Sequence, residues 1–277
     1  MKKRSKNKTK PRKNADNWIY GYHAVISAIK NENRVKYRLI LDIGAKKKLD
    51  KEPNIIIPKS LSVTIREKHE IQKLFSSKVN HQGIALEIEK LPQLKLQDFI
   101  KKFLNTHKST VAILDQLEDS QNVGAIFRSA YGLGIDAIIL TENQTVSENS
   151  FIAKTAAGGL DKIPYTTVTN ISSAIKVLQE NEFWIYGLDG SSNKIMSDIK
   201  FPKKTALVLG SEAEGMRSIT KNLCDEVFKI NINKNLESLN VSNAAAITFF
   251  YLPSAAPKEC MGSKAKIWRD IFKVSVK

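Results

Sequence analysis

The 277-residue sequence has little cysteine and little histidine. Its two cysteines, Cys224 and Cys260, stand far apart and form no CxxC pair. Neither a redox motif nor a disulfide framework is therefore expected, and the usage fits a cytoplasmic, reducing compartment. The histidines show no metal-ligand spacing, so we expect no zinc and no other metal. They are His23, His69, His81 and His107.

Long hydrophobic runs and nucleotide-binding glycine motifs are also missing. No stretch approaches the roughly 20 uncharged apolar residues of a membrane span, so we expect no membrane partner. "GLGID" at 132–136 is not a GxGxxG fingerprint, and no GxxxxGK[ST] loop or GxSxG elbow occurs. These absences argue against a nicotinamide site, a P-loop nucleotidase and a serine hydrolase. The acids Asp115, Glu118 and Asp119 are interpreted as a solvated loop, since exposure is usual for such residues.

Acidic residues are in deficit: 28 Asp and Glu face 44 Lys and Arg, a formal net charge of +16. Eight of the basic residues lie in "MKKRSKNKTKPRK", which has no apolar periodicity and predicts a disordered basic tail over residues 1–16. The rest of the chain is basic as well. RNA or DNA is the natural partner of such a surface, although charge that serves only solubility is the alternative.

The ordered part divides by pattern. Residues 17–89 predict a small α/β unit that ends in "HQGIALEIE", where apolar alternation indicates a half-buried strand. Residues 90–108 predict a linker with an amphipathic helix. Residues 109–252 alternate apolar strands with helical segments. Residues 253–277 carry too little pattern to assign a role.

The alternation in residues 109–252 predicts a parallel sheet covered by helices on both faces. In such sheets ligands bind at the carboxyl ends of the strands. Strands are expected at 110–116, 135–140, 162–168, 183–190, 205–210 and 227–232, and helices at 120–134, 149–159, 171–181 and 238–252.

The segment "NVGAIFRSA" (122–130) sets an arginine into an apolar stretch. As a helix it places Arg128 on the flank of the apolar face, in the same row as Gly124. A glycine there is expected to leave open space through which a ligand reaches the guanidinium. The ordinary alternative is an arginine whose stem lies along the core while its head stays in water.

Three polar loops follow strands: 114–130, 207–216 and 230–246. They resemble, in order and spacing, the three signature motifs of the SpoU-type RNA ribose 2′-O-methyltransferases, the TrmH family of the knotted SPOUT superfamily. The resemblance covers residues 110–252, and the front unit resembles the ribosomal-protein-like RNA-binding domain of the enzymes that methylate a guanosine of 23S rRNA. The matching motif residues are Asn122, Gly124 and Arg128, then Gly210, Glu212 and Gly215, then Ser238, Leu239 and Asn240. The chain departs from the pattern at Ser120, Ala157, Gly159, Asp161 and Asn231.

The resemblance implies an α/β-knot domain, a homodimer with its site between subunits, and S-adenosylmethionine as cofactor. It implies cofactor contacts at Gly210, Ile230 and Leu239. It implies that Arg128 meets the RNA and orients a phosphate, and that Glu212 holds Arg128 or the substrate. The other implied catalytic residues are Asn122, Ser238 and Asn240.

Each of these residues also has an ordinary explanation. Ile230 and Leu239 suit any core, and Glu212 any solvated loop. Asn122, Ser238 and Asn240 suit helix caps.

The function expected on this basis is transfer of a methyl group from S-adenosylmethionine to a ribose 2′-hydroxyl of rRNA, with a guanosine of 23S rRNA as the leading target. Two alternatives stay open. One is the same reaction on tRNA, and the other is a non-catalytic RNA-binding or ribosome-assembly protein with the same fold.

Overall fold

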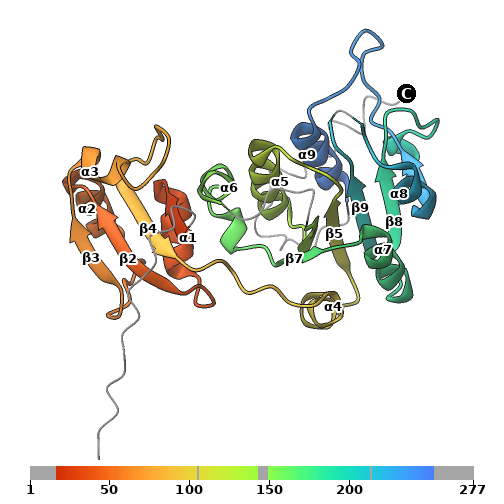
Figure 1. Ribbon diagram of the computed structural model, residues 1–277. Helices are drawn as coiled ribbons and strands as arrows, with labels where there is room; N and C mark the ends of the chain where they lie inside the picture. The colour runs from red at the N-terminus through yellow and green to blue at the C-terminus, as the bar shows by residue number, and fades with distance from the viewer. Residues whose placement is uncertain (1–16, 105, 143–148, 213, 253–277) are drawn as a thin grey trace, which may run out of the picture. The chain divides into compact units, whose positions relative to one another are not determined.

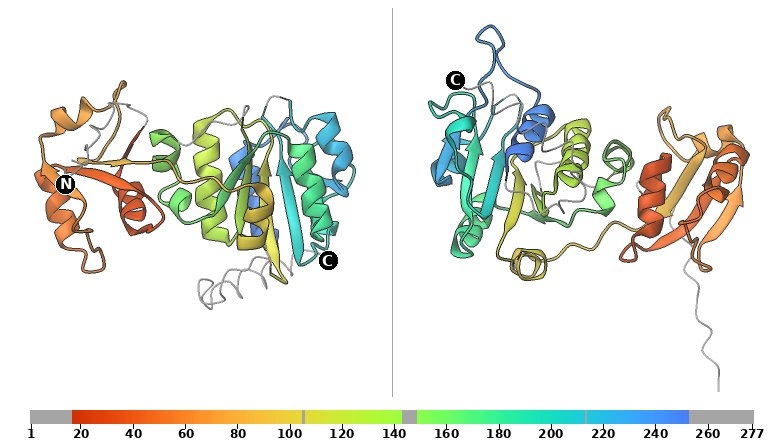
Figure 2. Two further views of the ribbon diagram at one scale, coloured as in Figure 1. Left: turned by 60° about the horizontal axis from the view of Figure 1, so that its bottom comes forward. Right: turned by 180° about the vertical axis from the view of Figure 1, so that it is seen from behind.

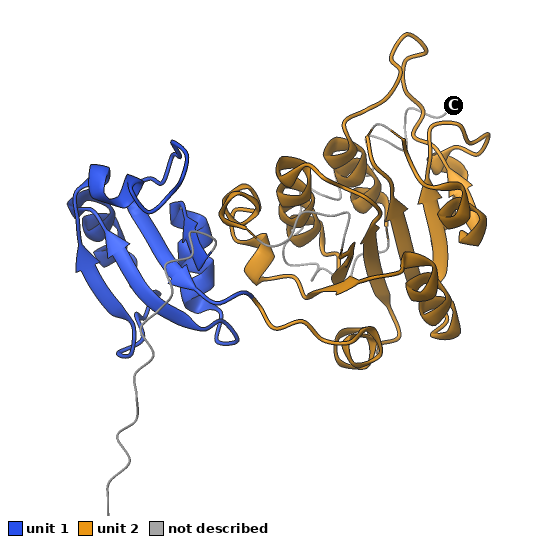
Figure 3. Cartoon of the chain, viewed as in Figure 1, with its two compact units in different colours: residues 1–90 blue, residues 91–277 orange. Residues whose placement is uncertain are grey.

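The computed structural model describes residues 17–252 apart from 105, 143–148 and 213 (Figure 1). The basic tail and the 253–277 extension lie outside the described residues. The chain forms two compact units, residues 1–90 and 91–277 (Figure 3). Among the described helices, none has both the length and the apolar character needed to cross a bilayer.

Unit 1 is a four-stranded sheet with helices, in the strand order β1-β4-β2-β3. β4 runs antiparallel to both β1 and β2, while β2 and β3 are parallel. Its elements are β1 (Trp18–Tyr20), α1 (Tyr22–Lys30), β2 (Lys36–Leu41), α2 (Ile43–Asp50), β3 (Ser62–Ile65), α3 (Lys68–Gln72) and β4 (Ile84–Ile88).

β4 is buried along its whole length, so the expectation of a half-buried strand is wrong. The strand lies between β1 and β2, and both of its edges are therefore paired. Even Glu87 is only 3% exposed, and Arg38 on β2 pairs with its carboxylate. A buried carboxylate needs such a partner.

The turn of residues 81–83 joins three elements of unit 1. The backbone N–H of Tyr22, at the start of α1, donates to Gln82 Oε1 at 2.8 Å. Gly83 has φ +74°, and a Cβ there would lie 2.2 Å from the carboxylate of Asp42, the N-cap of α2. Glycine at this position therefore lets β4 start directly against the α2 cap.

Unit 2 contains a six-stranded sheet in which every pairing is parallel, with the order β10-β8-β9-β5-β6-β7. The strands are β5 (Ser109–Leu114), β6 (Ala137–Thr141), β7 (Tyr165–Val168), β8 (Trp184–Leu188), β9 (Lys204–Leu209) and β10 (Glu226–Phe228). The helices are α4 (Leu96–Phe103), α5 (Ser120–Leu133), α6 (Ser150–Thr155), α7 (Ile171–Glu180), α8 (Ser218–Leu223) and α9 (Val241–Tyr251), with 3-10 turns η2 (Gly159–Asp161) and η3 (Met196–Asp198).

The parallel sheet is covered on both faces, as expected. On β5, Val111 and Ile113 share a core cluster with α4 and α7, and the intervening Ala112 and Leu114 are equally buried. α5 packs against α9 and α6, and α7 packs against α8 (Figure 2). The amphipathic helix of the 90–108 segment is α4, and its Phe99 and Ile100 belong to the unit 2 core.

Candidate active site

Three loops meet at the carboxyl edge of the parallel sheet. The chain builds β5, β6 and β7 outward in one direction and the remaining strands in the other, so the strand order reverses between β5 and β9. The loops after β5 and β9 therefore adjoin at the reversal point, where ligands bind in open α/β sheets. The segment 230–240, between β10 and α9, completes the edge, and two cavities open there.

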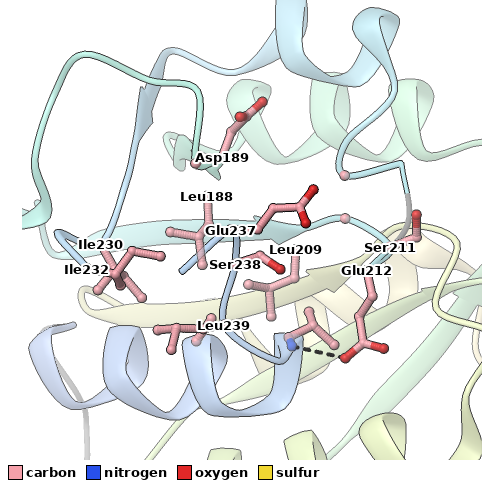
Figure 4. A pocket seen from close by; sticks show the side chains of 15 residues that line it. Leu188, Asp189, Leu209, Ser211, Glu212, Ile230, Ile232, Glu237, Ser238 and Leu239 are labelled. Carbon is pink, nitrogen blue, oxygen red and sulfur yellow. Dashed lines mark hydrogen bonds between the residues drawn. The ribbon is translucent and has the colours of Figure 1, made fainter. Parts of the chain in front are cut away.

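The first cavity lies between the β8, β9 and β10 loops and the start of α9 (Figure 4). Its volume is about 180 Å³, and it opens to solvent. Gly210, Ile230 and Leu239, the three residues expected to contact the cofactor, all line it, and so does Ser238. Ile230 and Leu239 are half-buried and border this cavity.

Gly210 lies where the loop turns back on itself. Ser211 and Gly215 exchange two backbone hydrogen bonds of 3.0 Å, and Gly215 has φ +67°. A Cβ on Gly210 would lie 2.2 Å from the backbone carbon of Gly215. Only glycine fits at 210, because the returning strand of the loop occupies the space of a side chain.

A polar network joins the three loops beside this cavity. The Asn240 amide Nδ2 donates to Asn122 Oδ1 at 3.0 Å and to Glu212 Oε1 at 2.6 Å. The backbone N–H of Val241 also donates to Glu212, at 3.3 Å. Asn122 and Glu212 line the second cavity, together with the β5 loop. One residue of each motif is therefore held in a single hydrogen-bonded group, and Glu212 lines both cavities.

Helix capping explains one of the three polar motif residues, Asn240, and does not explain the other two. Asp119, and not Asn122, is the N-cap of α5, so capping does not explain Asn122, which is buried within the helix. Asn240 does cap α9, where its Oδ1 accepts from the N–H of Ser242 at 3.0 Å. Ser238 precedes that cap and does not cap the helix.

Arg128 stands apart from this network. Its side chain is exposed on α5 and lines neither cavity, and it forms no hydrogen bond or ion pair with another described residue. Glu212 binds Asn240 and Val241 and not Arg128.

The space expected over Gly124 is closed. A Cβ there would lie 2.7 Å from Thr155 Cβ, because α6 packs directly against this turn of α5. The glycine therefore serves close helix packing and opens no path to Arg128. Gly159 packs equally close, since a Cβ there would lie 2.6 Å from the carbonyl oxygen of Phe127.

Sequence reasoning missed an ion pair beneath the site. Asp115, at the end of β5, is 1% exposed and accepts from Arg217 Nη2 at 2.8 Å and from Thr220 Oγ1 at 2.9 Å. Arg217 is the N-cap residue of α8 and follows the Gly210–Gly215 turn. The interpretation of Asp115 as solvated is therefore wrong, and the only signal against it in the sequence is its place directly after a buried strand.

Sequence reasoning also missed two acids of the first cavity, Asp189 and Glu237. Asp189 forms an ion pair with Lys221 at 2.7 Å and accepts from Ser191. Burial alone would raise the pKa of Asp189, but hydrogen bonds from Lys221 and Ser191 outweigh it and hold the pKa below its ordinary value. This carboxylate is therefore charged at neutral pH.

The lining suits a flat apolar group joined to a cation. Seven aliphatic residues line the first cavity with the carboxylates of Asp189, Glu212 and Glu237, and no lysine, arginine or histidine lines it among the described residues. The aliphatic residues are Leu188, Leu209, Ile230, Ile232, Leu239, Val241 and Ala244. Such a lining disfavours phosphate groups and suits an apolar ligand that carries positive charge. Within the described ranges no cluster of His, Cys, Asp or Glu has the grouping of a metal site.

Comparison with known proteins gives matches along both units. Residues 109–250 match the SpoU rRNA Methylase family, and residues 18–94 match the family described as RNA 2′-O ribose methyltransferase substrate binding. A Xylella fastidiosa protein named 23S rRNA (guanosine-2′-O-)-methyltransferase RlmB is 32% identical, over 84% of this chain and 94% of its own. A Staphylococcus epidermidis protein named putative TrmH family tRNA/rRNA methyltransferase is also 32% identical, over 84% of this chain and 93% of its own.

The fold agrees as well. The SpoU methyltransferase AviRb from Streptomyces viridochromogenes, solved in complex with AdoMet, superposes with a TM-score of 0.69 at 18% identity, over 84% of this chain and 87% of that one. The chain thus belongs to the SpoU rRNA methylase family, and it is an RNA ribose 2′-O-methyltransferase that uses S-adenosylmethionine.

Proposed function

We propose that the enzyme methylates the ribose 2′-hydroxyl of a guanosine in 23S rRNA, in the cytoplasm. The support is similarity to proteins named for that reaction along both units, front domain included. The same reaction on tRNA is the second candidate, because the Staphylococcus epidermidis relative carries both RNA classes in its name.

The donor occupies the first cavity in this proposal. Gly210 lets the backbone approach the adenosyl group closely, and Ile230 and Leu239 pack against it. Bound S-adenosylmethionine supplies an activated methyl group. One observation supports this donor-binding site best. Gly210, Ile230, Ser238 and Leu239 converge on one cavity beside the hydrogen-bonded network of Asn240.

In this proposal the hydrogen bonds of Asn240 orient the groups that bind the ribose. Asn240 holds Glu212 and Asn122 in place at the second cavity, so their remaining oxygen and nitrogen atoms are oriented toward an incoming ribose. Orientation of this kind is where much of the rate enhancement of a displacement reaction arises. The proton of the hydroxyl passes to water or to an RNA phosphate, since an arginine keeps its own protons.

We further propose that the enzyme is a homodimer and that Arg128 acts in the site of the partner subunit. α9 is apolar around nearly its whole circumference, and helices of that kind are buried. Yet Ile247, Phe250 and Tyr251 on α9 are exposed, as is Tyr131 on the adjoining α5. A second copy over these helices would cover them and bring the unpartnered Arg128 to another site.

The test of the target is a map of ribose methylation in RNA from cells with and without the gene. Loss of one 2′-O-methylguanosine from 23S rRNA is the expected result. Loss confined to a tRNA would favour the second candidate, and an unchanged map of both RNAs would contradict the proposed reaction.

The test of Arg128 uses purified protein and radiolabelled methyl donor. Arg128→Ala should still bind S-adenosylmethionine but lose methyl transfer by about 100-fold or more, because a charge-positioning group is absent from the transition state. Lys176→Ala, which removes an exposed cation from α7, is the matched control and should keep full activity.

Mixing variants tests the subunit arrangement. Arg128→Ala and Asn240→Asp each disable a homodimer, but a mixed dimer keeps one site with Asn240 from one subunit and Arg128 from the other. An equal mixture should recover about a quarter of wild-type activity, as statistical pairing of a two-fold dimer requires. No recovery after verified subunit exchange would place both residues in the same subunit's site.

A further inference from the structure

The cofactor cavity contains one carboxylate with no protein partner among the described residues. Of its three acids, Asp189 is paired with Lys221 and Glu212 is held by Asn240. Glu237 forms no hydrogen bond or ion pair within the described part of the chain. Figure 4 draws its side chain in the centre of the view, next to Ser238 and among the other lining residues.

The charge of the ligand changes during the reaction. The ribose oxygen forms a bond to the methyl carbon while the carbon–sulfur bond breaks, and that electron pair stays on sulfur. The sulfonium of the donor thereby becomes the neutral thioether of S-adenosylhomocysteine. Donor and product differ only in the transferred methyl group and in this charge, and the charge is the difference that a carboxylate of the cavity can detect.

We propose that Glu237 makes the cavity prefer the sulfonium donor over the thioether product. This inference rests on the cofactor seat proposed above. With no basic side chain among the described lining residues, no cation of the cavity itself competes for this carboxylate. The Glu237 side chain is exposed, and a bound ligand displaces part of the water around it, which strengthens attraction between the carboxylate and a nearby positive charge.

The preference has a consequence for turnover. The attraction that holds the donor disappears at the moment the methyl group leaves, whereas the apolar contacts of the adenosyl group remain. Product release is then faster than donor release. Loss of Glu237 should therefore leave an enzyme on which the product competes more effectively.

The experiment measures binding of S-adenosylmethionine and S-adenosylhomocysteine by calorimetry, without RNA. Glu237→Gln keeps the size of the side chain and removes its charge. It should weaken donor binding by about tenfold, equivalent to about 1.4 kcal/mol, and change product binding by less than about twofold. The control Glu180→Gln removes a charge from the end of α7 and should alter neither affinity.

The salt dependence gives a second readout. Donor affinity of the wild type should fall more steeply with salt than donor affinity of Glu237→Gln, because added ions screen the attraction. Equal weakening of donor and product would mean that the carboxylate contacts a group common to both, and it would overturn the proposal. No change in either ligand would overturn it as well.

A separate variant tests the seat itself. Leu239→Ala should weaken donor and product by the same factor, because it removes apolar contact and no charge. If Leu239→Ala binds both ligands like the wild type, the proposed seat is wrong. If it weakens both while Glu237→Gln keeps the wild-type ratio, the seat stands and only the role of Glu237 fails.

Discussion

At the scale of single residues, Asn240 joins helix geometry to the site. The oxygen of its amide accepts the N–H of Ser242 and caps α9, while its nitrogen donates to Asn122 and Glu212. Asparagine carries a capping acceptor and an N–H donor on separate atoms of one short side chain. The position of the last helix and that of the Glu212 carboxylate are thereby set by one residue.

Asn240→Asp separates these two roles. Aspartate caps a helix as well as asparagine does, so stability should change by less than about 1 kcal/mol through the cap. The donor to Glu212 is lost and two carboxylates then face each other, so methyl transfer should fall by about 100-fold. Urea denaturation and single-turnover kinetics measure the two effects.

Asn170→Asp is the matched control, because Asn170 caps α7 in the same way, accepting from the N–H of Ser172 at 2.9 Å and away from the site. It should leave methyl transfer unchanged. Full activity of Asn240→Asp would show that the bond to Glu212 has no part in the reaction.

At the scale of elements, the ion pair between Asp115 and Arg217 links the loop after β5 to the loop after β9. Arg217 lies directly after the turn that contains Gly210 and Glu212, and Asp115 directly follows β5. The guanidinium contacts both oxygens of the carboxylate, with the longer contact at 3.4 Å. The turn is thus held at its base to the central strand of the sheet.

Replacing Arg217 should destabilise the fold more than replacing Asp115. Arg217→Met leaves the carboxylate of Asp115 buried without its cation and should cost about 3 kcal/mol. Asp115→Asn leaves a partly exposed arginine that water can solvate, and should cost about 1–2 kcal/mol. The free energy of unfolding in urea decides the order, and an Arg217→Met variant as stable as Asp115→Asn would contradict this account.

Elements with local signals were predictable from sequence. α5 has an apolar stripe and a terminal glycine, and it begins and ends within one residue of the expected 120–134. α2 and α8 were missed because their sequences carry no stripe. α2 has three lysines in eight residues and depends on the Asp42 cap, while α8 is anchored by Thr220, which contacts Asp115 more than one hundred residues away.

The same distinction between local and long-range signals applies to the individual side chains. The three loops that line the cavities were predicted through motif order, since each motif is local. The burial of Glu87 and Asp115 and the closed space over Gly124 were not found, because each depends on a partner from a distant element: Arg38, Arg217 and Thr155 respectively. Long-range pairing of this kind leaves no periodic trace in the chain.

At the scale of the whole molecule, two units and a strongly basic composition serve one RNA substrate. The trefoil knot implied by the resemblance stays a prediction, as does the pairing of two subunits. Net charge is independent of both, because attraction to a phosphate backbone acts over about 8–10 Å in physiological salt and needs no exact fit. The eight cations of the first 13 residues are the densest such group in the sequence.

Deleting residues 2–13 should weaken RNA binding and flatten its salt dependence. Each phosphate contact on single-stranded RNA contributes about 0.7 to the slope of log K against log salt, so a tail that uses all eight cations would account for a slope of about 6. Fluorescence anisotropy with a labelled rRNA fragment, over a series of salt concentrations, gives the slope for both proteins.

The control keeps the length of the tail and replaces its lysines and arginines by serine and asparagine. If charge is what acts, this variant should bind RNA like the deletion, and donor binding should be unchanged in both because the cofactor cavity is lined by unit 2 alone. A charge-free tail that restores wild-type affinity would assign the effect to chain length. A slope identical in all three proteins would exclude the tail as a phosphate contact and leave the folded units to supply the whole attraction.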